Sequence, residues 1–307
     1  MSDRPKTPPS DADDLRRLRE LLLGDHIEQI DSVSERVQNP EMRTGDVAEV
    51  RSILFRIKHP DFSYREGQHV GVIVPGPHEF GHDVHFRLYT IANSPKTTPG
   101  GPVELELCVR RCFYLDEFSG EEEPGIASNY LCDMKPGDKV SISGPYGDVF
   151  DIPDDPETNL LMIGSGTGIA PFRAFVQHIY AKMPDWKGQV FLFYGARSGT
   201  ENLYRNELKN DMDKYYDRET FQAFEGLSKR PWMDRNDDGL SDLLKENADE
   251  IWELLQNPKT HLYLAGLERT REHFDEVMLS VAGSTARWNW MVEEMKEQNR
   301  WSELLYN

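Results

Sequence analysis

The chain has 307 residues, of which 38% are hydrophobic and 29% charged, which is typical of a folded protein with room for two ordinary domains. Its formal net charge of -19 argues against nucleic acid and anionic membranes as partners. No apolar run approaches the roughly 18 residues of a membrane helix, and the polar N-terminus has no signal-peptide core. We therefore expect no membrane insertion and a cytoplasmic protein.

The side chains that commonly bind metals are sparse. Cys108, Cys112 and Cys132 fit a reducing compartment, and we expect them to be packed thiols, because CxxxC suits neither an iron–sulfur nor a zinc site. Three of the nine histidines fall within residues 78–85, but no carboxylate–histidine spacing completes a metal motif. The sequence predicts no metal site.

Residues 1–32 are predicted to precede the first domain. Residues 1–14 are rich in Pro, Asp and Ser and are expected to be disordered. The leucines of residues 15–23 have the spacing of a short amphipathic helix ending at Gly24. This helix is expected to dock on the protein itself, with docking on a partner as the alternative.

Residues 33–153 are predicted to form a small antiparallel β-barrel. Short runs of alternating apolar residues are separated by Gly and Pro, as in barrels of this kind. The runs are residues 47–57, 69–76, 87–95, 102–111 and 138–147.

Residues 154–307 are predicted to form an α/β domain with a parallel sheet. Strand patterns at residues 160–166, 190–198, 221–227 and 261–267 alternate with helical ones. The helices are expected at residues 171–183, in the acidic stretch after residue 198, and at residues 240–255 and 271–283. Ligands of such sheets lie beyond the C-terminal strand ends.

A glycine-rich turn follows the first strand of this domain. Residues 159–175 read NLLMIGSGTGIAPFRAF, with Gly164, Gly166 and Gly168 in the turn and Pro171 in the first helical turn. A helix N-terminus binds anions, although the turn lacks the third glycine of the familiar dinucleotide fingerprint. A purely structural turn is the alternative.

Two stretches of the barrel have the groups that a flavin dinucleotide requires. Residues 87–90 supply an arginine fork for pyrophosphate, a tyrosine face for a ring system and a hydroxyl. Residues 125–133, GIASNYLCD, open a helix after Gly125. Either stretch alone is equally well explained as a structural strand or a capped helix.

Together, seven motifs resemble, in order, those of the plant-type ferredoxin–NADP reductase family. They are YREGQ at 64–68, RLYT at 87–90, LCVRR at 107–111, GIASNYLCD at 125–133, GPYG at 144–147, GSGTGIAPFR at 164–173 and LAGL at 264–267. The resemblance covers residues 50–306 and implies an FAD-binding barrel followed by a pyridine-nucleotide domain.

The resemblance also implies roles for individual residues. Thr90, beside the flavin nitrogen, and Tyr306, covering one flavin face, would be catalytic. The FAD-binding residues would be Arg87, Leu88, Tyr89, Thr90, Cys108, Val109, Arg110, Tyr114, Gly125, Ile126, Ala127, Ser128 and Tyr306. The nicotinamide nucleotide would contact Thr167, Ala196, Arg197, Ser228, Lys229, Gly266 and Leu267.

The chain departs from the family pattern near its end. Ala265 stands where the family usually has a cysteine, Leu304 where it has a glutamate, and Asn307 follows the closing tyrosine. Glu303 lies one place before the expected glutamate. These departures put the rate of hydride transfer in doubt, and not the fold. Hydride transfer itself depends mainly on the placement of the two cofactor rings.

The resemblance implies NADPH as the favoured nucleotide, with NADH possible. Ser228, Lys229 and Arg230 suit a ribose phosphate, but the tyrosine expected about ten residues later is missing. Solvation of the two basic side chains is the alternative.

The implied function is electron transfer between NADP(H) and a one-electron carrier, ferredoxin or flavodoxin, through FAD, in either direction. One alternative is a reductase that feeds an oxygenase or another redox subunit. Another is a flavin-binding or assembly subunit with little turnover. A patch of Arg110, Arg111, Lys135 and Lys139 is the predicted docking surface for an acidic ferredoxin.

Overall fold

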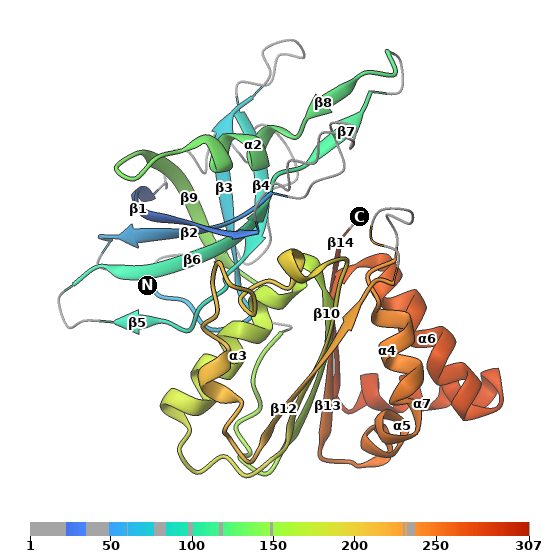
Figure 1. Ribbon diagram of the computed structural model, residues 1–307. Helices are drawn as coiled ribbons and strands as arrows, with labels where there is room; N and C mark the ends of the chain where they lie inside the picture. Colours follow the sequence, from blue (N-terminus) through green and yellow to red (C-terminus); the bar gives the residue numbers. More distant parts are fainter. Residues whose placement is uncertain are drawn as a thin grey trace. The chain divides into compact units, whose positions relative to one another are not determined.

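In the computed structural model the chain divides into two compact units, Met1–Asp148 and Val149–Asn307, a few residues before the expected boundary at residue 153 (Figure 1). The structure describes residues 23–34 by their backbone, and residues 49–59, 61–76, 84–97, 101–116, 119–147, 150–229, 231 and 237–306. Within these ranges no helix is both long and apolar enough to span a bilayer.

Seven antiparallel strands form the main sheet of the N-terminal unit, in the order β4-β3-β9-β1-β2-β6-β5. They are β1 Leu23–Ser34, β2 Val50–Ile57, β3 His69–Pro75, β4 Val84–Thr90, β5 Lys96–Thr97, β6 Val103–Arg110 and β9 Lys139–Tyr146. The sheet closes on itself because Ile91, directly after β4, bridges to Leu107 of β6, and the Ala92 amide donates to the Glu106 carbonyl at 2.8 Å. The predicted antiparallel barrel is confirmed.

The barrel encloses an apolar core supplied by alternate residues of its strands. On β2, for example, Ile53, Phe55 and Ile57 are fully buried, as the two-residue period of a strand requires. Helix α2, Ile126–Asp133, packs against β3, β4 and β6 and buries Leu131 in the same core. Between β6 and α2 the chain forms a hairpin of β7, Phe113–Leu115, and β8, Glu122–Pro124.

Strand β1 was not expected. It pairs with β2 from His26 to Ser34 and with β9 from Leu23 to His26, so the barrel begins about ten residues before the predicted start at residue 33. The helix expected over residues 15–23 lies outside the described residues except for Leu23, which begins this strand. The tail expected at residues 1–14 lies wholly outside them.

The C-terminal unit is built on a five-stranded parallel sheet in the order β12-β11-β10-β13-β14. Its strands are β10 Asn159–Ser165, β11 Val190–Ala196, β12 Phe221–Leu227, β13 Thr260–Leu267 and β14 Trp301–Tyr306. The central strand β10 is buried from Leu160 to Ser165, which is why it reads as a continuous apolar run. The predicted α/β fold is confirmed.

Helices cover both faces of this sheet (Figure 1). Helix α3, Ile169–Lys182, covers one face, where Phe172 and Phe175 pack with Phe150 and Tyr263. The other face carries α4 Leu240–Glu246, α5 Ala248–Gln256, α6 Glu268–Ala282 and α7 Thr285–Glu297. Both faces of the sheet are thus covered, and the C-terminal ends of its parallel strands share one edge.

Two predicted helices are wrong in detail. The helix expected over residues 240–255 is two helices that break at Asn247, whose side chain donates to the Leu243 carbonyl. The acidic stretch after β11 forms only the short 3-10 turns η3, Gly199–Glu201, and η4, Asp213–Tyr215. There Asn206 bonds to the backbone of nearby residues and competes with a regular helix.

Candidate functional site

In the N-terminal unit, the predicted flavin-binding residues of β4 divide between its two faces. Arg87 and Tyr89 share one face, and Leu88 and Thr90 share the other. Tyr89 is half-buried against the barrel core, and burial raises the pKa of its hydroxyl. Arg87 is exposed, and no described carboxylate pairs with it. An exposed guanidinium beside a half-buried ring fits the pyrophosphate and ring of a dinucleotide.

Helix α2 begins at Gly125 without a capping side chain from the described residues and without an acidic residue in its first turn. The Ser128 hydroxyl donates to the Gly125 carbonyl at 3.2 Å and accepts from the Cys112 amide at 3.1 Å. Both hydrogen bonds of the Ser128 hydroxyl therefore stabilise the turn before α2. A phosphate would instead meet the backbone N–H groups of Ile126, Ala127 and Ser128. These residues fit FAD, whose pyrophosphate they would bind.

The remaining predicted FAD contacts lie on neighbouring strands. Cys108 and Val109 are buried on β6, while Arg110, at the end of that strand, is exposed. Tyr114 lies on the β7–β8 hairpin with more than half of its surface exposed. An exposed aromatic ring is available to stack on an adenine, whereas the two buried residues would contribute through backbone atoms.

The three cysteines are expected to differ sharply in reactivity. Burial raises the pKa of the Cys132 thiol to about 12, while Cys112 is exposed. Because the thiolate is the reacting form, a disulfide reagent at pH 8 should label Cys112 quickly and leave the buried Cys108 and Cys132 unlabelled until guanidinium is added. Spectrophotometric thiol counting, with Cys112→Ser as the control, checks this. A fast phase that survives in Cys112→Ser would contradict it.

The same reagent also probes the flavin side. The Cys112 carbonyl accepts from the Gly125 amide at 2.9 Å and from the Asn129 amide at 2.8 Å, so this thiol borders the start of α2. Bound FAD is therefore expected to slow its labelling.

In the C-terminal unit, the predicted nucleotide residues lie along the C-terminal edge of the parallel sheet. The ends of adjacent strands are in register, with Ser165 opposite Gly195, Ala196 opposite Leu227 and Leu267 opposite Tyr306. Thr167, Arg197, Ser228 and Lys229 directly follow three of these ends. This is the edge at which open α/β sheets bind their ligands.

The glycine turn packs directly against the end of β13. A Cβ atom on Gly168 would lie 2.2 Å from the Ala265 carbonyl oxygen, and one on Gly164 would lie 2.7 Å from it. Helix α3 begins at Gly168 with no capping side chain from the described residues and no acid in its first turn. The Ile169 amide donates to the Gly166 and Thr167 carbonyls and Pro171 has no N–H, so a nucleotide pyrophosphate would instead meet the amides of the preceding 3-10 turn η2, Gly166–Gly168.

Thr167 and Tyr306 come from opposite ends of the unit's sequence and meet at this edge. The Thr167 Oγ1 and Tyr306 hydroxyl oxygens are 2.6 Å apart. The Tyr306 ring is 40% exposed at the end of β14. The hydroxyl–hydroxyl bond thus fixes where the closing aromatic lies at the nucleotide edge.

Three predicted nucleotide contacts already have carboxylate partners. Arg197 pairs with Glu201 at 2.6 Å, the Ser228 hydroxyl donates to Asp237 at 2.7 Å, and Lys229 pairs with Asp242 at 2.6 Å. Arg230 lies outside the described residues. The edge is therefore less basic than the sequence predicted.

The register of β14 explains the place of Glu303. This carboxylate accepts from the Arg271 guanidinium and the Trp301 indole, and lies 3.6 Å from the Lys296 ammonium. It is thus fixed among α6 and α7. Leu304 lies on the opposite face and is the register partner of Ala265. Side chains one residue apart on a strand point to opposite faces of the sheet, so Glu303 does not replace the family's glutamate.

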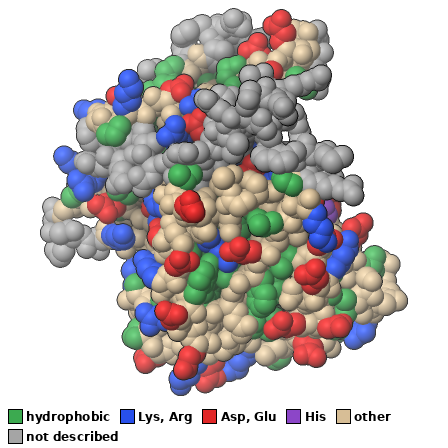
Figure 2. Space-filling model, in the orientation of Figure 1, with side chains coloured by type: hydrophobic (Ala, Val, Ile, Leu, Met, Phe, Trp, Pro, Cys, Tyr) green, Lys and Arg blue, Asp and Glu red, His purple; other side chains and the backbone are tan. Residues whose placement is uncertain are grey.

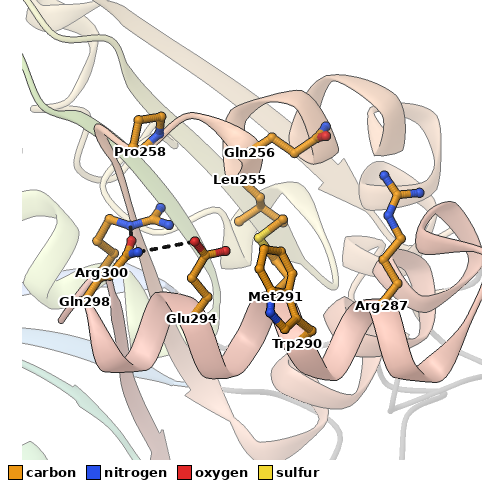
Figure 3. Close-up of a pocket in the computed structure, with 9 residues that line it drawn as sticks. All are labelled: Leu255, Gln256, Pro258, Arg287, Trp290, Met291, Glu294, Gln298 and Arg300. Atoms are coloured by element: carbon orange, nitrogen blue, oxygen red, sulfur yellow. Dashed lines mark hydrogen bonds between the residues drawn. The ribbon is translucent and has the colours of Figure 1, made fainter.

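A cavity of about 320 Å³ lies at the opposite, N-terminal edge of the same sheet (Figure 3). Its walls are α5, α7 and the residues that precede β13 and β14. The lining is Leu255, Gln256, Pro258, Arg287, Trp290, Met291, Glu294, Gln298 and Arg300. Arg300 donates to Gln298 at 2.7 Å and to the Thr260 carbonyl at 3.0 Å, so it holds the strand starts together. We assign this cavity no part in the nucleotide site.

Sequence reasoning missed residues that support the turn. The Tyr194 hydroxyl donates to the Gly166 carbonyl at 2.8 Å, and the Ser165 and Thr270 hydroxyls lie 3.2 Å apart. A tyrosine at the end of an otherwise apolar strand was the available signal. The carboxylates Glu201, Asp237 and Asp242 gave no signal of comparable strength, because acids are common throughout this chain.

Comparison with known proteins agrees with both halves of this description. Residues 43–150 match the oxidoreductase FAD-binding domain, and residues 162–275 match the oxidoreductase NAD-binding domain. The ferredoxin–NADP reductase of Spirulina sp. is 35% identical over 274 residues, covering 86% of this chain and 92% of that protein. The chloroplastic leaf isozyme 1 of Arabidopsis thaliana is 34% identical over 270 residues, covering 86% and 74%.

A third relative is longer. The ferredoxin–NADP reductase of Synechocystis sp. is 34% identical over 270 residues, covering 85% of this chain, and the match spans 64% of that protein. Among solved structures, the ferredoxin–NADP+ reductase of Plasmodium falciparum with 2'P-AMP has a TM-score of 0.67 at 22% identity, covering 94% of this chain and 97% of that one. That likeness supports the two-domain fold. The sequence relatives establish more: the chain belongs to the ferredoxin–NADP reductase family.

Proposed function

We propose that the protein transfers electrons between NADP(H) and a one-electron carrier protein, ferredoxin or flavodoxin, through FAD. The observation that carries the proposal is a pair of helical N-termini, one in each unit: that of α2, and that of the 3-10 turn η2, which leads into α3. Neither has a capping side chain from the described residues or an acid in its first turn. Each is suited to a pyrophosphate, as a protein that binds two dinucleotides requires.

The cofactors supply the chemistry, which is hydride exchange with the nicotinamide and single-electron exchange at the flavin. The protein binds and orients them. Arg87 and the α2 amides would bind the FAD pyrophosphate, while Tyr89 and Thr90 would position the flavin ring. The Thr167 hydroxyl, the amides of the η2 turn and the Gly266 backbone would align the nicotinamide nucleotide.

Tyr306 has a second proposed role, as a mobile cover. Its hydroxyl bond to Thr167 holds the ring at the edge where the nicotinamide arrives. The ring must leave that position for the nicotinamide to enter, and the bond sets part of the energetic cost of this step.

The docking surface predicted for the carrier is only partly basic. Arg111 bonds to Glu49, Asn129 and Asp133, so its charge is largely neutralised. The Lys135 backbone amide donates to the Asp138 carboxylate at 2.8 Å, which places a negative charge beside this lysine. On the face in view in Figure 2, acidic and basic side chains are interspersed. A carrier that relies less on its own negative charge than acidic ferredoxins do is consistent with this surface.

The cytoplasm is the proposed location. None of the three cysteines, all of which lie in the described part of the chain, forms a disulfide, as expected in a reducing compartment.

The decisive experiment is anaerobic stopped-flow reduction of the FAD-loaded protein by NADPH and by NADH, followed at the flavin absorbance band. Fast bleaching supports the proposal. A flavin that stays oxidised favours the alternative of a flavin-binding subunit with little turnover. The apolar Ala265–Leu304 pair, which stands where the family has a cysteine and a glutamate, is the observation behind that alternative. Titration of the protein with ferredoxin at low and high salt then distinguishes a reductase that uses ferredoxin as its carrier from one that feeds an oxygenase. No complex at low salt counts against ferredoxin.

A further inference from the structure

Ser228, the first residue after β12, lies at the C-terminal edge of the parallel sheet, where open α/β sheets bind their ligands. It is almost fully buried, and its amide donates to the Ala196 carbonyl at 3.2 Å. Ser228 is therefore anchored to the end of β11. Any group bound to the Ser228 hydroxyl is held at the nucleotide edge of the sheet.

That hydroxyl already donates to a carboxylate that the fold holds in place. Asp237 Oδ2 accepts from Ser228 at 2.7 Å, and Asp237 Oδ1 accepts from the Gly239 amide at 2.9 Å. Gly239 has a φ of +72° and packs against the backbone of Gly226 and Leu227, where a Cβ atom would lie within 2.7 Å of both. The Asp237 carboxylate is thus positioned by the Ser228 hydroxyl and by the closely packed backbone at Gly239.

Neighbouring charges strengthen the negative character of this place. The Lys229 ammonium pairs with Asp242 at 2.6 Å, and this bond raises the pKa of Lys229 and lowers that of Asp242. Asp238 is buried, with its carboxylate 3.8 Å from the Arg269 guanidinium. Within residues 237–242, three carboxylates therefore face two cationic side chains of the described chain.

We propose that Asp237 is the specificity-determining residue for the nucleotide, and that it makes the protein discriminate only weakly between NADPH and NADH. A ribose 2'-phosphate bound at Ser228 brings a dianion beside the Asp237 carboxylate, and the two repel. A 2'-hydroxyl instead donates a hydrogen bond to the same carboxylate, as acidic residues do in NAD-binding proteins. This inference rests on the proposed function, because it assigns the nucleotide of that same site.

The test compares Asp237→Asn with the wild-type, FAD-loaded protein. The amide oxygen still accepts from Gly239, but the negative charge is gone, so the ratio of kcat/KM for NADPH over NADH should rise about tenfold. Isothermal titration with 2'-phospho-AMP should show a comparable gain in affinity, while 5'-AMP, whose 2'-hydroxyl loses its carboxylate acceptor, should bind no more tightly than it does to the wild type. Because charge repulsion is screened, the gain should shrink in 1 M salt.

Two further variants keep the test decisive. Asp249→Asn, at an exposed position in the first turn of α5, removes the same charge away from the site and should leave the ratio unchanged. Asp237→Ser also removes the charge and should shift the ratio in the same direction as Asp237→Asn. It therefore keeps the test available if Asp237→Asn folds poorly. Well-folded Asp237 variants with wild-type ratios and wild-type 2'-phospho-AMP affinity would overturn the inference. A wild-type flavin that neither nucleotide reduces would overturn the proposed function, while the titration would still decide the role of Asp237.

Discussion

Gly168→Ala is expected to destabilise the C-terminal unit by about 3 kcal/mol and to abolish tight nucleotide binding. Gly168 has φ of -59° and ψ of -13°, which alanine adopts readily, so the cost is steric. The added methyl carbon would lie 2.2 Å from the Ala265 oxygen and 2.8 Å from the Gly266 nitrogen. Both are backbone atoms of β13, so either the glycine turn or the strand end must move.

Urea unfolding followed by tryptophan fluorescence measures this loss selectively. All six tryptophans lie in the C-terminal unit, and Trp252, Trp288 and Trp301 pack in its core. The fluorescence therefore reports this unit, whatever the barrel does. Binding of 2'-phospho-AMP, measured by calorimetry, reports the nucleotide site.

Two other glycines supply matched controls. Gly199 has open space around its Cβ position, so Gly199→Ala should change stability by less than about 1 kcal/mol. Gly166 also has open space but a φ of +54°, so Gly166→Ala isolates the conformational penalty, about 1 kcal/mol. If Gly168→Ala unfolds at the same urea concentration as Gly199→Ala, the close approach to β13 does not constrain the turn.

Features carried by short stretches of sequence could be predicted. The apolar run of β10 followed by glycines and Pro171 places a strand, a turn and α3 correctly, because each depends on residues close together in the chain. Parallel strands then bring Thr167, Arg197 and Ser228 to one edge without further information.

Features that depend on distant partners could not be predicted. Strand β1 contains Gly24 and several acids, and only its pairing with β2 and β9 makes it a strand. The pairing of Asp237 with Ser228 likewise joins residues nine positions apart, and no sequence pattern marks it. Sequence spacing placed basic and hydroxyl groups at the nucleotide edge but did not show which of them carboxylates engage.

Arg87→Ala is expected to weaken FAD binding about 100-fold or more. The exposed guanidinium of Arg87 lies on the same face of β4 as Tyr89, so it would give pyrophosphate two charge-assisted hydrogen bonds that alanine cannot replace. Arg87→Lys keeps the charge without the planar fork and should lose about tenfold. Titration of the apo-protein with FAD, followed by quenching of flavin fluorescence, gives the affinities.

The order of the variants separates a pyrophosphate contact from a general effect of charge. Lys58→Ala removes an exposed positive charge from the same unit and should bind FAD as the wild type does. A pyrophosphate contact predicts that affinity falls in the order wild type, Arg87→Lys, Arg87→Ala, with tryptophan-monitored stability of the C-terminal unit unchanged. Equal affinity in Arg87→Ala and Lys58→Ala would mean that the α2 amides hold the pyrophosphate without Arg87. In that case β4 would contribute only the ring of Tyr89 and the hydroxyl of Thr90.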